Sequence, residues 1–227
     1  MLEILFDPKS TFVDALIYIF SFLTVAFLTL PIHEFAHAFT AVKLGDNTPR
    51  WQGRLTINPF AHIDYIGALF VLFFGFGWAK PVQVNHLNFK KPKRDMAIVA
   101  LAGPLSNIIM AFIFGILFYA INLFEYFYLS NSFLSYLMDF CRFVVEINVS
   151  LAVFNLIPIP PLDGSRILSA FLSDRTYYKI MKYERYIYYG LLLLLFTGVL
   201  DGPINFLSGA IMSLLDIICN AIFRIFI

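Results

Sequence analysis

The stretch that decides the fold covers residues 16–44 and reads LIYIFSFLTVAFLTLPIHEFAHAFTAVKL. Residues 16–30 contain no charged side chain, so this part is long and apolar enough for a helix inside a bilayer. Within the stretch lies His33-Glu34-Phe35-Ala36-His37, whose two histidines project from one face of a helix about one turn apart. The sequence therefore predicts a membrane helix that carries two imidazoles and a carboxylate.

The composition indicates an integral membrane protein. Of 227 residues, 60% are hydrophobic, 18% are aromatic and 14% are charged, and the mean hydropathy is +0.79. Soluble domains are closer to half apolar and a quarter charged, so we expect the lipid bilayer as a partner. The net charge of +1 gives no sign of nucleic acid as a partner. The acidic residues 1–9 and the uninterrupted apolar run that follows predict no cleavable signal peptide.

The two cysteines carry no chemistry that the sequence reveals. Cys141 and Cys219 lie in apolar segments without motif spacing. Neither a disulfide framework nor a cysteine-type zinc site is therefore expected.

Several apolar segments follow the first helix, which we expect to run from Thr11 to about Leu44 with a kink at Pro31. They comprise a short glycine-broken run over 66–78, full-length helices over 96–124 and 133–157, and a tail over 186–227 that divides at 201–203. The run over 66–78 suits a re-entrant segment better than a span. We predict an α-helical polytopic membrane protein with about five or six membrane segments, one of them re-entrant, and short β-strands in membrane-associated loops near 55–57 and 81–85.

His33 and His37 have the spacing at which two imidazoles bind one Zn2+, and Glu34 falls where a metal-activated water would sit. The alternative is that both histidines are core residues with satisfied hydrogen bonds. We favour the metal site because polar groups at bilayer depth are costly without a partner. Catalytic zinc takes three protein ligands and keeps one open position, so a third ligand must come from another segment.

Asp163 is the best candidate for that third ligand. Pro158, Pro160 and Pro161 end the preceding helix and Gly164 follows, so the backbone around this carboxylate is non-helical. Such backbone is tolerated at membrane depth only when it is buried in protein or lines a wet cavity. The alternative is that Asp163-Gly164 is a turn at the end of a helix.

The ligand set constrains the topology. The histidines and Asp163 each lie near the C-terminal end of an apolar segment, so those segments must run in the same direction, and residues 66–78 must dip into the bilayer and return. Most basic residues then share one side: Lys43, Arg50, Arg54, Lys80, Lys90, Lys91, Lys93, Arg94, Arg166, Arg175, Lys179, Lys182 and Arg185. The positive-inside rule places this side, with the site, nearer the cytoplasm of a cell membrane. The basic run over 90–94 is expected to anchor the chain at the membrane surface rather than to bind nucleic acid.

Together, HEFAH over 33–37 and NLIPIPPLDG over 155–164 resemble the site-2 protease family of intramembrane zinc metalloproteases. GFGWAKPVQVN over 75–85 and GPLSN over 103–107 are similar to further family segments, so the likeness covers about 20–170. The resemblance implies that His33, His37 and Asp163 bind one zinc ion and that Glu34 is catalytic. It also implies regulated intramembrane proteolysis, with single-pass membrane proteins as substrates.

The resemblance implies a single transmembrane metalloprotease domain over 1–227, with a core over about 11–170 and C-terminal helices over 186–227. The chain shows no stretch that fits the PDZ or CBS domain of many family members. This departure leaves substrate recruitment and regulation open, but the motifs that carry the chemistry are present.

Other polar residues have two interpretations each. Asn148 and Asn155 share a helix face that leads to Asp163, so they are candidates to clamp substrate backbone or stabilise an oxyanion; the alternative is polar contact between helices. Val82 and Val84 suit pairing with an extended substrate. For Asn107, beside Gly103, close helix packing is favoured over catalysis.

The alternative function is a membrane transporter or ion-conducting protein that uses the intramembrane histidine, aspartate and glutamate side chains. It is disfavoured because inverted repeats are not visible in the sequence and because the acid–base residues have protease spacing.

Overall fold

The structure, a computed structural model, describes residues 11–62, 64, 80–127 and 131–224. Its first helix is continuous over Phe12–Leu44 and consists of α2 (Phe12–Thr24), a π-helical turn η1 (Val25–Thr29) and α3 (Leu30–Leu44). The N–H of Leu30 donates to the carbonyl of Val25, five residues back. Pro31 has no N–H for the regular helical ladder, which accounts for a π-helical turn where the sequence predicts a kink.

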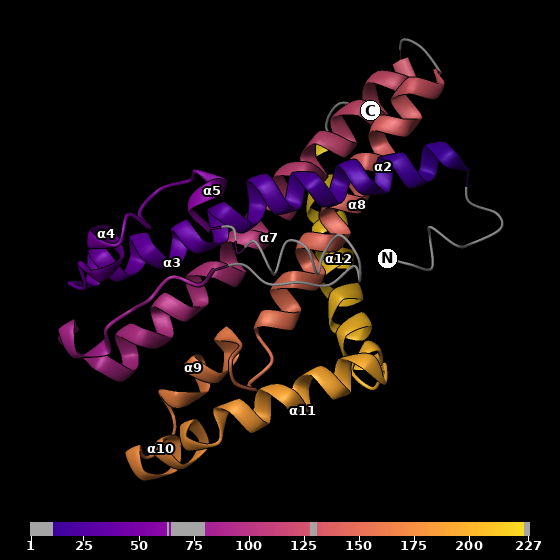
Figure 1. The fold of residues 1–227 in the computed structure, drawn as a ribbon. Coiled ribbons are helices and arrows are strands. Elements are labelled where there is room, and N and C mark those ends of the chain that lie inside the picture. The colour runs from indigo at the N-terminus through magenta and orange to yellow at the C-terminus, as the bar shows by residue number, and fades with distance from the viewer. Residues whose placement is uncertain (1–10, 63, 65–79, 128–130, 225–227) are drawn as a thin grey trace.

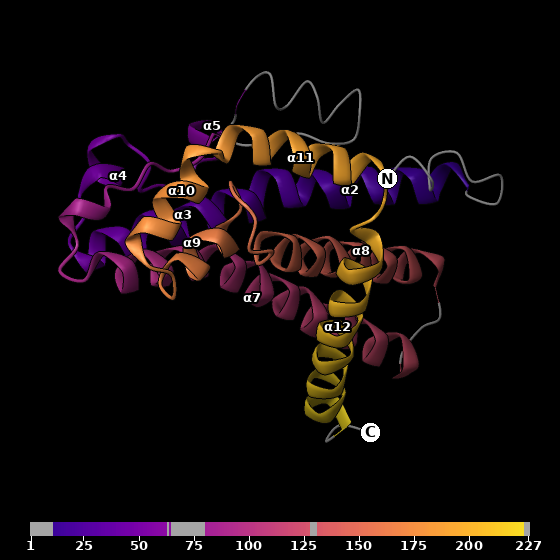
Figure 2. The ribbon, with the colours of Figure 1, turned by 90° about the horizontal axis from the view of Figure 1, so that it is seen from below.

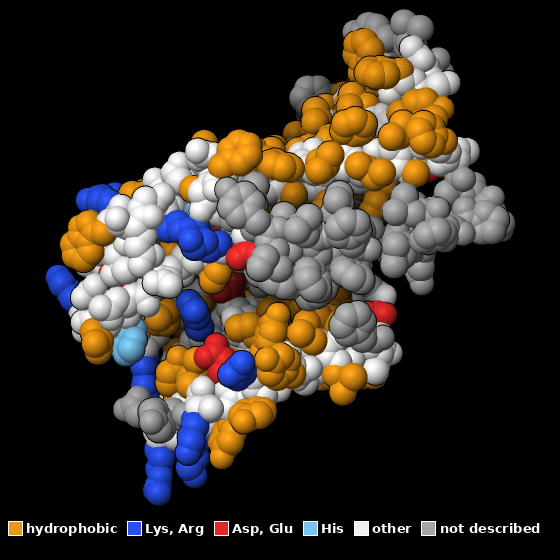
Figure 3. Space-filling model, in the orientation of Figure 1, with side chains coloured by type: hydrophobic (Ala, Val, Ile, Leu, Met, Phe, Trp, Pro, Cys, Tyr) orange, Lys and Arg blue, Asp and Glu red, His pale blue; other side chains and the backbone are white. Residues whose placement is uncertain are grey.

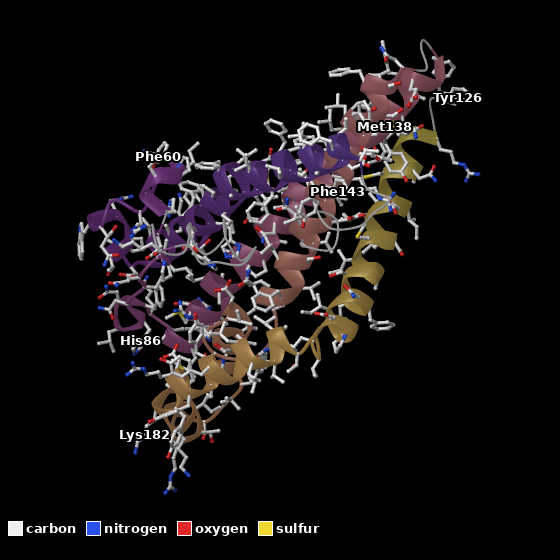
Figure 4. The ribbon with its side chains drawn as sticks, turned by 45° about the vertical axis from the view of Figure 1, so that its right-hand side comes forward. Phe60, His86, Tyr126, Met138, Phe143 and Lys182 are labelled. Atoms are coloured by element: carbon white, nitrogen blue, oxygen red, sulfur yellow. The ribbon has the colours of Figure 1, made fainter. Side chains whose placement is uncertain are left out.

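Two long helices pack against this first helix (Figure 1). They are α7 (Pro92–Phe127), which contacts α3, and α8 (Ser132–Asn155), which contacts α2 and α7. On the α2 side, Phe143 of α8, labelled in Figure 4, meets the ring of Tyr18 edge-on with centroids 5.4 Å apart. Towards the site, Ala41 of α3 packs with Val99 of α7, and Gly103 of α7 leaves no room for a Cβ atom beside the two histidines.

The remaining helices are shorter or lie outside this core (Figures 1 and 2). They are α4 (Thr48–Trp51), α5 (Pro59–His62), η2 (His86–Asn88), α9 (Asp163–Ser169), α10 (Asp174–Lys182), α11 (Glu184–Phe196) and α12 (Asp201–Phe223). The last helix, α12, forms an apolar cluster with α7 and α8. In this cluster Leu215 of α12 packs with Ala111 of α7 and Val149 of α8.

The prediction of a helical membrane protein is confirmed. Three helical stretches in the described ranges are long and apolar enough to cross a bilayer: Phe12–Leu44, Pro92–Phe127 and Asp201–Phe223. They leave large apolar side chains exposed, among them Phe20 and Phe206, as expected for surfaces that face lipid. The predicted total of five or six membrane segments is not confirmed, and the re-entrant segment predicted over 66–78 lies outside the described residues.

The short strands predicted near 55–57 and 81–85 are not confirmed, and the part of the chain that the structure describes contains no β-strand. In the second segment the backbone amides bond to side chains instead of to a neighbouring strand. Val82 N–H donates to Glu34 at 2.9 Å, and Asn85 N–H donates to Asp46 at 2.7 Å. The alternating apolar residues therefore belong to a segment that contacts α3 at Glu34 and the turn after α3 at Asp46.

On α8, Arg142 and Glu146, four residues apart, form an ion pair in which Arg142 Nε lies 3.0 Å from Glu146 Oε1.

Asp46 joins the segment over 80–89 to the C-terminal end of α3. The helix ends at Gly45, whose φ of 114° is a conformation that side chains disfavour. The next side chain, Asp46, is fully buried and accepts hydrogen bonds from the backbone and hydroxyl of Thr48, the backbone of Asn85 and the side chain of Asn88. This one carboxylate therefore fixes where the 80–89 segment passes the helix.

We expect Asp46→Asn to destabilise the protein by about 2 kcal/mol at neutral pH, because at least one buried donor loses its charged acceptor. Burial disfavours the carboxylate, but the hydrogen bonds from Thr48, Asn88 and Asn85 hold the pKa of Asp46 below its usual value. Its contribution is therefore present above the ordinary aspartate pKa and is lost as the pH falls through the lower folded-state pKa. Thermal unfolding should be measured at stepwise lower pH. The difference in unfolding temperature between Asp46→Asn and the native protein should become smaller as the pH falls.

The control for this test is Asp139→Asn, which removes the same charge from an exposed position on α8. It should unfold like the native protein at neutral pH. If the difference in unfolding temperature between Asp46→Asn and the native protein stays constant down to strong acid, the stabilising role assigned to the Asp46 carboxylate is wrong.

Candidate metal centre and active site

Three potential metal ligands from two distant segments converge on one point. His33 and His37 come from α3, and Asp163 is the first residue of α9. The Nε2 atoms of the two histidines lie 3.0 Å apart, and they lie 3.4 and 3.2 Å from Asp163 Oδ2. Both imidazoles are buried, and the Asp163 side chain is 14% exposed.

These separations fit a tetrahedral ion. Ligand atoms about 2.0–2.1 Å from a tetrahedral Zn2+ lie about 3.4 Å from one another, close to the three spacings observed. Two imidazole nitrogens and one carboxylate oxygen are also ligand types that zinc takes in catalytic sites. The donor set occupies three corners of the tetrahedron, so a fourth corner is left for water or substrate.

The far nitrogen of each imidazole has a partner on α7. His37 Nδ1 lies 2.7 Å from the carbonyl oxygen of Val99, so this nitrogen carries the hydrogen and donates it. His33 Nδ1 lies 3.3 Å from Asn107 Oδ1 and donates in the same way when Nε2 is left free to bind a metal. The two contacts fix the tautomers and the ring orientations, so both Nε2 atoms face Asp163.

Gly103 makes this approach possible. Val99, Gly103 and Asn107 follow at intervals of four on α7, so they share one helix face. A Cβ atom at position 103 would lie 2.3 Å from His37 Nε2 and 2.6 Å from His33 Nε2. Only glycine leaves enough space for the imidazoles of His33 and His37 to reach Asn107 and Val99, their partners on α7.

Asp163 is held in place by a second close approach. The α8 helix ends at Asn155, and the irregular backbone that follows leads to the start of α9. A Cβ atom at Gly164 would lie 2.2 Å from the carbonyl oxygen of Leu156, so this turn of α9 packs directly on the irregular backbone.

Glu34 lies beside His33 on α3 and contacts the 80–89 segment. Its Oε2 accepts the hydrogen bond from Val82 N–H at 2.9 Å. One carboxylate oxygen is thus anchored by backbone, which limits the side chain to a narrow range of positions next to the ligand cluster. A carboxylate in this place is suited to accept and return a proton.

Comparisons with known proteins agree with this arrangement. The profile described as peptidase family M50 matches residues 120–198. The provisionally named zinc metalloprotease YwhC of Bacillus subtilis (strain 168) is 39% identical over 170 residues, which cover 75% of this chain and 77% of the relative. The chain belongs to peptidase family M50. It is therefore a zinc-dependent metalloprotease, and the resemblance to the site-2 protease family is confirmed.

Two further relatives match at lower identity. The protein provisionally named zinc metalloprotease Rip2 of Mycobacterium tuberculosis (strain H37Rv) is 29% identical over 180 residues, 77% of this chain and 66% of the relative. MJ0611 of Methanocaldococcus jannaschii, also provisionally named a zinc metalloprotease, is 30% identical over 138 residues, 60% of this chain and 62% of the relative. No solved structure gives a significant match.

The structure places the two predicted substrate-binding asparagines of this M50 peptidase on α8. Asn148 is fully buried and its Nδ2 donates to the carbonyl of Val144, while the Nδ2 of Asn155 donates to the carbonyl of Leu151. Both donors are thus engaged within their own helix. The Oδ1 of Asn148 is buried and has no hydrogen-bond partner among the described atoms, so it is the acceptor of this side chain that is not yet used.

Asn107 is the residue whose role the sequence analysis missed. Close packing was favoured for it, whereas the structure makes it the partner of His33 across 74 residues of sequence. The sequence does contain a signal for this role: an amide in the middle of a long apolar helix requires a partner, and Asn107 lies four residues after Gly103 on the same face.

We expect Gly103→Ala to weaken zinc binding on the order of 10- to 100-fold, the loss typical of misoriented histidine ligands. The added methyl group would occupy the space of both Nε2 atoms, so the rings must turn away from Asp163. Competition with a chelator of known affinity measures the change. Gly115→Ala on the same helix is the matched control, because its nearest new contact is Cys219 Sγ at 3.4 Å. Equal zinc affinity in both variants would contradict the assigned role.

Proposed function

We propose that this M50 peptidase is an intramembrane zinc metalloprotease that hydrolyses peptide bonds in or near the transmembrane segments of single-pass membrane proteins, as in regulated intramembrane proteolysis. The observation that carries the proposal is the convergence of His33, His37 and Asp163 on one buried point, beside a helix long enough to span a bilayer. Ordinary zinc proteases have no need for such a helix.

His33, His37 and Asp163 would hold one zinc ion per chain, with Nε2, Nε2 and Oδ2 as the ligand atoms. Zinc bound there supplies a Lewis acid that polarises a peptide carbonyl and makes water acidic enough to ionise near neutral pH. The protein contributes the fixed geometry: Val99 and Asn107 orient the imidazoles, and the apolar helices limit the access of bulk water.

Glu34 is the proposed general base and acid. It follows the ligand His33 directly and is anchored through one oxygen to Val82 N–H, which leaves its other oxygen for the proton of the attacking water. After the carbonyl is attacked, the same carboxyl group passes the proton to the leaving amine.

A transmembrane substrate must unwind before cleavage, because the peptide bonds of a helix are already hydrogen-bonded and shielded. The segment over 80–85 is suited to hold an extended substrate, since it passes directly by Glu34 and forms no strand pair within the described residues. Asn148 would contribute an acceptor, Oδ1, for a substrate N–H, while Asn155 lies farther along the same helix towards Asp163.

The distribution of charge supports a multi-pass protein of the cell membrane with its active site nearer the cytoplasm. Lysine and arginine side chains gather at the end of the molecule that contains α4, α9 and α10 (Figure 3). Figure 4 labels His86 and Lys182 at this end and Tyr126 at the opposite end. Since α9 begins with Asp163, the basic end is also the end that contains the metal centre.

Glu34→Gln should leave zinc bound and reduce cleavage by at least about 10²- to 10⁴-fold, because the amide cannot accept the proton. The assay is cleavage of a transmembrane peptide by the purified, zinc-loaded protein in liposomes, together with the zinc content by mass spectrometry. Glu125→Gln, near the far end of α7, is the control and should cleave normally. If Glu34→Gln cleaves the peptide nearly as fast as the control, the proposed role of Glu34 as general base and acid is wrong.

The same variant tests the substrate class. Membrane fractions from cells with Glu34→Gln should accumulate single-pass fragments that cells with the native protein remove. Metal-independent ion flux through liposomes, without any cleavage, would favour a transporter instead.

Asn107→Leu removes the acceptor for His33 Nδ1 and should weaken zinc binding by about 10- to 100-fold. Asn107→Asp keeps an acceptor oxygen at the same place and should largely restore the affinity. Asn122→Leu, at an exposed position on the same helix, controls for the added apolar surface. If Asn107→Asp binds zinc as weakly as Asn107→Leu, Asn107 acts through packing and its proposed orienting role is wrong.

A further inference from the structure

A cavity of about 780 Å³ lies between the N-terminal end of α7 and α9, and none of the three candidate metal ligands lines it. One end of it is lined by Lys91, Lys93 and Arg94. The rest is lined mainly by apolar side chains, among them Leu101 and Phe171. We refer to this cavity as the α7–α9 crevice.

The basic end of the crevice has an excess of positive charge. Asp95 is an acidic side chain that adjoins it; this carboxylate is buried, pairs with Arg94 at 2.7 Å and accepts from the backbone of Lys91. The Nζ of Lys93 donates to the carbonyl of Leu172, beyond the end of α9. Lys91 and Arg94 thus bring two positive charges to this end against the one carboxylate of Asp95, and the Lys91 side chain is exposed there.

The other part of the crevice exposes apolar surface. Ile98 is 43% exposed, Leu101 is 46% exposed and Phe171 is 83% exposed. Along α7, Leu101 lies about 10 Å beyond Arg94, at about 1.5 Å per residue. The headgroup layer of a bilayer is about 5–7 Å thick on each side, so cations at one end and apolar side chains at the other match a headgroup and the start of an acyl chain.

We propose that the α7–α9 crevice is a binding site for one anionic phospholipid. Its phosphate-bearing headgroup lies against Lys91 and Arg94, and an acyl chain lies along Ile98, Leu101 and Phe171. A zwitterionic phospholipid has the same apolar part but no net charge for the basic end, and inorganic phosphate has the charge but nothing for the apolar end. The site therefore distinguishes its ligand by both parts together.

The position of the crevice gives the lipid a structural consequence. Its two walls are α9, whose first residue is Asp163, and α7, whose residues Val99 and Gly103 contact the imidazoles. A lipid that bridges the walls holds Asp163 towards the two histidines. This effect on the metal centre rests on the proposed function, whereas the lipid site itself does not.

The test is native mass spectrometry of the full-length protein in detergent, with phosphatidylglycerol and phosphatidylcholine of identical acyl chains offered in equal amounts. The native protein should retain phosphatidylglycerol in preference. Lys91→Gln should weaken this retention about fivefold, the effect of one lysine near an anionic lipid surface. The neighbouring Lys90→Gln removes the same charge outside the crevice and should retain the lipid as the native protein does.

A matched pair on α7 tests the apolar end. Leu101 lines the crevice and Leu105, one turn further, does not, although both are about half exposed. Leu101→Ser should lose phosphatidylglycerol and Leu105→Ser should keep it, and excess inorganic phosphate should not displace the lipid. Equal retention of the two lipids, equal losses in Lys90→Gln and Lys91→Gln, no difference between the two leucine variants, or displacement by phosphate would each overturn the proposal.

Discussion

The structure depends on one constraint: two imidazoles and a carboxylate on apolar helices need a partner for every polar atom. The Nδ1 atoms of His33 and His37 find theirs on α7, in Asn107 and in the carbonyl of Val99. The Nε2 atoms then face one another and Asp163, an arrangement in which three ligand atoms surround a site for a cation. The second partner of each ring thus determines where the metal site lies.

This constraint explains why α3 and α7 approach so closely. A backbone carbonyl reaches an imidazole only when no side chain stands between the helices, and Gly103, one turn after Val99, removes the side chain that would cover it. Ala41 of α3 packs with Val99 of α7 in the same contact. Small residues between membrane helices are usually explained by packing alone, but here they also admit a hydrogen bond that orients a ligand.

The sequence was sufficient to predict the parts that follow from local spacing. The helix with His33 and His37, the proline-rich break before Asp163 and the choice of Asp163 as candidate ligand follow from periodicity, from proline chemistry and from the number of ligands that zinc requires. The role of Asn107 did not follow, because spacing along a helix defines a face but not which side chain lies opposite it. The strand expected over 81–85 failed for a similar reason, since its amide partners are the side chains of Glu34 and Asp46.

The glycines beside the ligands are required by space rather than by chemistry. Gly164 lets the first turn of α9 rest on the carbonyl oxygens of Leu156 and Ile157, and Gly103 lets two rings rest on α7. Asp163 reaches the histidines only because the chain turns back sharply after α8, and that turn requires the contact at Gly164. Substitution of either glycine would therefore move the candidate ligand atoms without changing any candidate ligand, so these sequence motifs extend beyond His33, His37 and Asp163.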